Sequence, residues 1–172
     1  FICRPDKLLP PIPVPEGIQF IGIDSGIRHA VGGSNYADVR TAAFMGFTII
    51  SKSLGLTEKD IKQFRISGNR KDLAYNGYLS SIEPDDFDKN FRALLPEKIT
   101  GIDFISLYGD TIDLNSQINP QTEYLVQIST QHPVEENARV NTFMKLLQDF
   151  SLDQDFEKLN QLKFLMQALF LQ

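Results

Sequence analysis

The sequence has little cysteine, little histidine and no long hydrophobic run. Its single cysteine, Cys3, excludes an internal disulfide and a cysteine-based zinc site, and fits a reducing, cytoplasmic compartment. Two histidines are too few for a dedicated histidine-rich metal site. No apolar run approaches the roughly 18–20 residues that a membrane-spanning helix needs. Composition therefore gives no reason to expect a disulfide framework or a membrane partner.

The charge balance is mildly acidic. The 172 residues carry a formal net charge of −5, with 23% charged and 42% hydrophobic residues, and lysine and arginine are scattered along the chain. This distribution argues against nucleic acid or an anionic membrane surface as the main partner. The length fits a single domain over residues 1–172 with enough apolar residues for a real core.

Several common catalytic motifs are missing from the sequence. It contains no G-x-x-x-x-G-K-S/T phosphate loop, no G-x-G-x-x-G after a strand, no H-E-x-x-H and no G-x-S-x-G. Any catalytic role must therefore use residues outside these motifs.

Hydrophobic periodicity predicts an α+β fold, mostly helical with a small partial sheet. Residues 18–23 are apolar on both faces and predict a buried strand. A helix is expected from Asn35 to just before Gly55, with an apolar stripe at steps of three and four. The stripe comprises Tyr36, Val39, Ala43, Phe47, Ile50 and Leu54.

Further elements are predicted by capping residues and prolines. In chain order they are a short helix from Thr57 through Phe64, a helix from Pro84 to before Pro96, a strand at 124–128, a helix opened by Pro133, and a last helix capped by Ser151 and Gln154.

Both ends of the chain look cut. It opens with Phe1 and Ile2 and stops within a strongly apolar pattern from Phe164 to Gln172. A helix that is apolar on most sides is typical of the interior of something larger. We therefore expect the chain to be a piece of a longer protein.

The loop from Asp24 to Tyr36 gathers the densest set of candidate functional residues. It joins the predicted strand to the predicted helix, and functional residues concentrate on loops held by rigid elements. The set comprises Asp24, Arg28, His29, Asn35, Tyr36 and Arg40. The same residues also fit a glycine turn with a local Asp24–Arg28 ion pair. Elsewhere, Asp110 and Asp113 carry no distinctive spacing.

This loop also carries a resemblance to a known family. The segment FIGIDSGIRHAVGGSNYADVRTAAFMG, from Phe20 to Gly46, resembles the central segment of galactokinase-like sugar kinases, members of the GHMP kinase superfamily. The spelling IDSGIRHxVGGxxYxxVR is similar to the branch that contains L-arabinokinases. A second match, QHPVEENARVNTFMKLL from Gln131 to Leu147, is similar to a helix of the same branch.

The resemblance implies roles for four residues. The position of Tyr36 contacts the sugar in this family, and a phenol can pack on a sugar face and bond a hydroxyl. The position of Arg28 lies beside the catalytic aspartate, where a guanidinium favours the ionised carboxylate. Asp24 and His29 are expected on the substrate side, mainly to hold the loop.

The family's sugar-binding first motif, Ser-rich phosphate loop, catalytic aspartate and final glycine-rich motif have no counterpart in the chain. The resemblance therefore implies a parent kinase whose other segments bind ATP and Mg²⁺, and an isolated chain that is inactive. The expected partners are a monosaccharide, phosphorylated on its anomeric hydroxyl, and the rest of the parent chain. Galactose, L-arabinose or a relative fits this expectation. The alternative is a non-catalytic sugar sensor.

Overall fold

The structure is a computed structural model that describes residues 2–3, 6–7, 11–24, 26, 34–153 and 155–168. It divides into two compact units. One comprises Phe1–Arg28 with Asn137–Gln172, and the other comprises His29–Glu136. The described elements are mostly helical, with two short antiparallel sheets of two strands each. This confirms the mostly helical α+β class, while the single domain over 1–172 stays a prediction.

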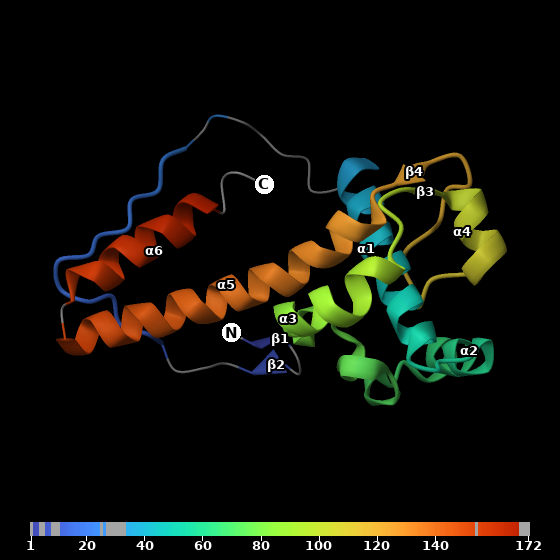
Figure 1. Ribbon diagram of the computed structural model, residues 1–172, viewed down its shortest axis with the longest axis horizontal. Coiled ribbons are helices and arrows are strands. Elements are labelled where there is room, and N and C mark those ends of the chain that lie inside the picture. The colour runs from blue at the N-terminus through green and yellow to red at the C-terminus, as the bar shows by residue number, and fades with distance from the viewer. Residues whose placement is uncertain are drawn as a thin grey trace. The chain divides into compact units, whose positions relative to one another are not determined.

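The long helix α1, Ser34–Ser53, organises the unit formed by His29–Glu136 (Figure 1). Its middle is buried on nearly every side, from Thr41 through Ser51. The prediction of an apolar stripe was wrong at its two ends, because Tyr36, Val39 and Leu54 are 62%, 54% and 52% exposed. Burial begins at Thr41, so the first two turns of α1 lie beyond the core.

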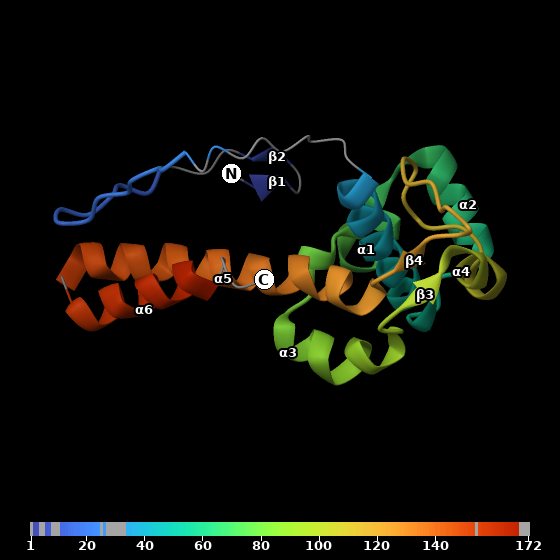
Figure 2. The same ribbon diagram turned by 90° about the horizontal axis from the view of Figure 1, so that it is seen from above.

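The core around α1 is built from helices and the second sheet. In both views α4, Gly101–Tyr108, and the strands β3, Ile99–Thr100, and β4, Glu123–Tyr124, lie close to α1 (Figures 1 and 2). The strands β3 and β4 pair with Ile99 opposite Tyr124 and Thr100 opposite Glu123. The main cluster comprises Ala42, Met45, Ile49, Ile50, Ile82, Phe87, Phe91, Leu95, Phe104, Tyr124, Val126 and Val134.

One close crossing depends on a glycine. A Cβ built on Gly46 would lie 1.8 Å from Oγ1 of Thr130. The backbone of α1 therefore approaches the helix α5, Val126–Asp153, so closely at this point that any side chain at position 46 would collide with Thr130.

The helix α2, Glu58–Ser67, begins at the capping residues that the sequence predicts. The Thr57 hydroxyl accepts the Asp60 backbone N–H, and the Asp60 carboxylate accepts the Thr57 backbone N–H at 2.8 Å. This is a capping box. The helix ends at Gly68, which adopts a left-handed φ of 65°.

The segment between α2 and β3 is a series of short helical turns. Pro84 begins its helical turn and Phe87 and Phe91 are buried, as the sequence predicts. Leu94, which was expected in the same apolar stripe, is 45% exposed. The turns are 3-10 turns at Arg70–Asp72, Ala74–Gly77 and Leu79–Ser81, the single turn α3 at Pro84–Asp86, a π turn at Phe87–Phe91 and a 3-10 turn at Arg92–Leu94.

Two predicted elements around Tyr124 need correction. The strand expected at 124–128 stops at Tyr124, because Val126 already begins α5, which extends to Asp153. Pro133 lies inside α5 and does not open it. Its missing N–H costs one helical hydrogen bond, and the helix nevertheless continues through it.

The unit formed by Phe1–Arg28 and Asn137–Gln172 contains the later part of α5 and the helix α6, Phe156–Ala168, which lie side by side in both views (Figures 1 and 2). The short strands β1, Ile2–Cys3, and β2, Asp6–Lys7, pair antiparallel. Asp155 starts α6 by accepting the Glu157 backbone N–H at 2.9 Å. The predicted cap was wrong, because Ser151 lies within α5; Gln154 lies outside the described residues.

The predicted buried strand at 18–23 is also wrong. The segment forms no strand, and Ile21 and Ile23 are 75% and 88% exposed. The Phe20 ring instead lies against the Phe143 ring on α5, and the two ring centroids are 6.3 Å apart. A strand needs a hydrogen-bonded neighbour, and within the described chain none pairs with this segment.

Candidate functional site

Of the four predicted site residues, all within residues 24–36, the structure describes Asp24 and Tyr36. Tyr36 stands on the first turn of α1, with 62% of its surface exposed. Asp24 is exposed in the other compact unit, where its Oδ1 accepts the Gly26 backbone N–H at 2.8 Å. Arg28 and His29 lie outside the described residues. Their predicted roles stay predictions.

Arg40, in the described part of the loop–helix segment, has an ion-pair partner that the sequence does not reveal. Nη2 of Arg40, one turn after Tyr36, donates to both carboxylate oxygens of Asp113, at 3.0 Å and 2.9 Å. The side chain of Asp113 is only 5% exposed, whereas that of Arg40 is 40% exposed. The Arg40 guanidinium also lies over the Phe44 ring, 5.3 Å from its centroid.

Asp113 is itself held by several contacts. The Ser116 hydroxyl donates to Asp113 Oδ2 at 2.6 Å, and the Thr111 hydroxyl donates to its carbonyl at 3.4 Å. Nη2 of Arg65 donates to the same carbonyl at 3.5 Å. Because the carboxylate is buried and accepts charge-assisted hydrogen bonds, its position is well determined.

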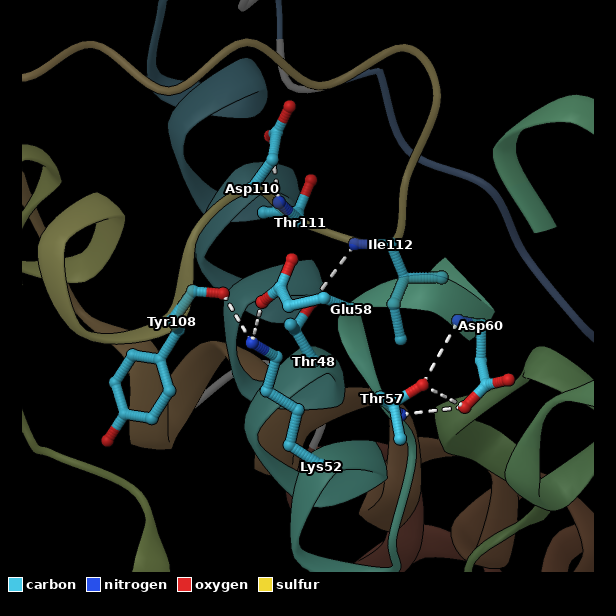
Figure 3. A network of polar contacts seen from close by, with 9 residues as sticks. All are labelled: Thr48, Lys52, Thr57, Glu58, Asp60, Tyr108, Asp110, Thr111 and Ile112. Atoms are coloured by element: carbon cyan, nitrogen blue, oxygen red, sulfur yellow. Dashed lines mark hydrogen bonds and ion pairs between the residues drawn. The ribbon is translucent and has the colours of Figure 1, made fainter. Parts of the chain in front are cut away.

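The segment that carries Asp113 lies along α1 through two further contacts, both visible in Figure 3. The Ile112 backbone N–H donates to the Thr48 hydroxyl at 3.0 Å, and the Lys52 ammonium donates to the Tyr108 carbonyl at 2.7 Å. We call these contacts, together with Arg40–Asp113, the α1 seam. The segment therefore runs antiparallel to α1, from Tyr108 at the end of the helix to Asp113 near its beginning.

Around the end of α1 the seam is supported by charge and capping. The Lys52 ammonium also pairs with the Glu58 carboxylate at the start of α2, close to the Thr57 capping box (Figure 3). Asp110 pairs with Arg65 and accepts the Thr111 backbone N–H at 2.8 Å. These contacts join α1, α2 and the segment after α4 into one polar network.

A small pocket lies beside the seam. Its volume is ≈ 80 Å³, and its lining includes Phe44, Phe64, Arg70, Asp113 and Asn115. Ligand pockets usually measure about 300–1,000 Å³, and a cavity volume of roughly 10–15 Å³ already holds one water. The pocket therefore has room for a few waters but not for a monosaccharide.

The described residues form neither a cluster of metal ligands nor a membrane-spanning helix. Within ranges 2–3, 6–7, 11–24, 26, 34–153 and 155–168, no group of three or more His, Cys, Asp or Glu side chains is placed to hold a metal ion. In the same part of the chain, no helix combines the length and apolarity required to cross a bilayer.

Sequence reasoning missed Asp113 as a member of this site. It lies 73 residues from Arg40, within a turn-rich stretch that shows no periodicity. A local pattern carries no information about such a pairing. The placement of Arg40 next to a glycine-rich loop was the one available signal, and it indicated the arginine but not its partner.

Comparison with known proteins gives a similarity to a sugar kinase. No protein-family model and no solved structure matches the chain. The chain is 31% identical over 174 aligned residues to an L-arabinokinase from Arabidopsis thaliana. The alignment covers 95% of this chain, and the chain spans 17% of the length of that relative. Nearly the whole chain is thus similar to one portion of an L-arabinokinase.

Proposed function

We propose that the chain is a segment of an ATP-dependent sugar kinase that phosphorylates the anomeric hydroxyl of L-arabinose, galactose or a related sugar. The observation that carries this proposal is the 31% identity to an L-arabinokinase along 95% of the chain. The chain spans 17% of that relative, so the proposed activity belongs to a longer parent protein.

Tyr36 is proposed to contact the sugar. Its exposure of 62% on the first turn of α1 supports this role, because a ligand-contacting side chain must be reachable from outside the core. Its phenol offers an apolar face to the sugar C–H groups and a hydroxyl that both donates and accepts hydrogen bonds. Asp24 and His29 are proposed to hold the loop that precedes the helix.

Arg28 is proposed to lie beside the catalytic aspartate of the parent. A guanidinium at this place keeps the aspartate ionised and offsets charge on the transferred phosphoryl group. Phosphoryl transfer depends mainly on in-line positioning and charge stabilisation, so one such arginine has a large effect on rate.

ATP and Mg²⁺ supply the phosphoryl group and its charge neutralisation, and the described residues do not fit either. They include no glycine-rich phosphate loop and no cluster of metal ligands. We propose that other segments of the parent hold the nucleotide and the metal.

The proposal is tested by steady-state kinetics of the intact parent. Arg28→Ala is expected to lower kcat by roughly a hundredfold or more, as losses of transition-state charge stabilisation do. Tyr36→Phe is expected to raise the sugar KM several-fold while kcat changes little, because it removes a contact made equally in the ground state and the transition state. Wild-type constants in both variants would contradict the assignment of these residues.

A further inference from the structure

We propose that Asp113 is a positioning residue that fixes Tyr36 in place by holding Arg40. This inference rests on the proposed function of Tyr36 as a sugar contact. It adds to that function a residue from a distant part of the sequence, whose role is to set the direction of the first two turns of α1.

The first two turns of α1 need such a tether because the core does not reach them. Tyr36 and Val39 are more than half exposed, and full burial starts at Thr41. Among the described residues, the one polar side-chain contact that residues 36–40 make outside α1 is that of Arg40 with Asp113. Within the described part of the chain, this ion pair is therefore the polar side-chain restraint that ties residues 36–40 to a segment outside α1.

The geometry of a helix connects Arg40 directly to Tyr36. Residues four apart lie one above the other on the same side of an α-helix. A shift of Arg40 therefore moves Tyr36 with it, because both belong to the same hydrogen-bonded turn. Phe44 lies one turn further along α1, and the Arg40 guanidinium lies over its ring.

The other side of the restraint is rigid. Asp113 is 5% exposed and accepts from Ser116 as well as from Arg40. Its neighbour Ile112 is 2% exposed and is bonded to Thr48, two turns further along α1. The segment is thus fixed to the buried middle of α1 and from there restrains the exposed beginning of the same helix.

The experiment is a kinetic double-mutant cycle in the full-length parent. Asp113→Asn keeps the size of the side chain but removes the charge that holds Arg40. We expect it to raise the sugar KM about tenfold while the ATP KM and kcat change less than about twofold. In a Tyr36→Ala background the same change is expected to have little further effect, because coupled residues are not additive.

Asp88→Asn provides a matched control. Asp88 also binds an arginine through two hydrogen bonds, from Nε and Nη2 of Arg92 at 2.9 Å and 2.6 Å, and it lies on the π turn after α3. Among the described residues, its hydrogen bonds go to Arg92 and not to the α1 seam, and its side chain is 59% exposed against 5% for Asp113. This variant is expected to leave the sugar KM unchanged, which separates loss of an ion pair in general from loss of this one.

The outcomes distinguish failure of the proposed Tyr36 role from failure of the proposed Asp113 role. If Tyr36→Ala leaves the sugar KM unchanged, the proposed role of Tyr36 fails. If Tyr36→Ala raises the sugar KM but Asp113→Asn does not, the positioning role of Asp113 is overturned and the role of Tyr36 remains. The same conclusion follows if Asp113→Asn raises the sugar KM equally in the wild-type and Tyr36→Ala backgrounds.

A second variant covers the case in which Asp113→Asn does not fold. Ser116→Ala removes only the hydrogen bond to Asp113 Oδ2 and leaves the ion pair. We expect a two- to threefold rise in the sugar KM, again absent in the Tyr36→Ala background. An unchanged sugar KM in the folded Ser116→Ala protein would count against the inference.

Discussion

Tyr75 combines an unusual backbone conformation with a specific side-chain contact. Tyr75 and Asn76 both have φ of 53°, and Gly77 follows with φ of 75°. The Tyr75 hydroxyl donates to Asp86 Oδ2 at 2.8 Å, and its ring meets Phe91 edge-on, 6.0 Å between centroids. These contacts hold a backbone that a tyrosine rarely adopts.

The Tyr75 contact has a predictable pH dependence. Burial, followed by the hydrogen bond to Asp86, raises the pKa of Tyr75 from 10.0 to about 12. The folded state thus favours the protonated phenol, and this stabilisation is complete below pH 10.0 and is lost as the pH rises through about 12. Wild type should exceed Tyr75→Phe by about 1–2 kcal/mol in free energy of unfolding near pH 9, and by less near pH 11.

Urea unfolding of both proteins at the two pH values measures this difference. The Phe variant keeps the ring and loses only the hydroxyl, so other pH-dependent groups cancel in the comparison. A difference that is the same at both pH values would show that the phenol does not titrate as expected.

Gly46 sets the distance between two helices. An alanine Cβ would lie 1.8 Å from the Thr130 hydroxyl, so Gly46→Ala must push α1 and α5 apart. We expect a loss of about 2–3 kcal/mol in free energy of unfolding, although alanine is the better helix former. Chemical denaturation measures it, with Gly22→Ala as the control.

Gly22 has nothing within 4 Å of an added Cβ and no positive φ. Its alanine variant should therefore stay within about 0.5 kcal/mol of wild type. Equal stability of the Gly46 and Gly22 variants would contradict the close crossing of α1 and α5.

At the scale of elements, α5 contains the clearest departure from local preference. Pro133 occupies its interior, where the ring removes one backbone hydrogen bond. Pro133→Ala restores an N–H that can donate to the Ser129 carbonyl. We expect the free energy of unfolding to rise by roughly 1–3 kcal/mol, measured by denaturant unfolding with unchanged m-value. A decrease would indicate that the proline makes contacts that outweigh the lost bond.

Several local signals in the sequence were informative, although the helix start expected at Pro133 and the cap expected at Ser151 were wrong. Thr57 and Asp60 predicted the start of α2 because a capping box satisfies orphan N–H groups within four residues. The period of α1 likewise predicted its extent to within one or two residues. The Asn76–Gly77 pair is a further local signal, typical of a tight turn with positive φ, that the sequence reasoning did not use.

Where partners come from elsewhere in the chain, local reasoning failed. The segment 18–23 has strand-like composition but no neighbouring strand among the described residues. The stripe of α1 included Tyr36 and Val39 because periodicity does not show where the core ends. The candidate loop was singled out by its motif and stays a prediction, whereas the pairing of Asp113 with Arg40, 73 residues away, could be found only from the folded structure.

At the scale of the whole molecule, the chain forms two compact units, and the helix α5 contributes to both. One unit carries Tyr36 and the α1 seam, and the other carries Asp24. The relative it matches is much longer, since the chain spans 17% of that protein. The proposed activity therefore belongs to a longer parent protein, to which we propose that this chain contributes Tyr36.

The most direct test of this account is sugar-dependent release of ADP by the purified full-length parent, measured with L-arabinose and with galactose. We expect ADP release to saturate with at least one of these sugars, and its sugar KM to rise in the Tyr36→Phe protein. Sugar binding without ADP release would contradict the kinase activity and favour a sensor. Neither binding nor turnover with either sugar would contradict the sugar site itself.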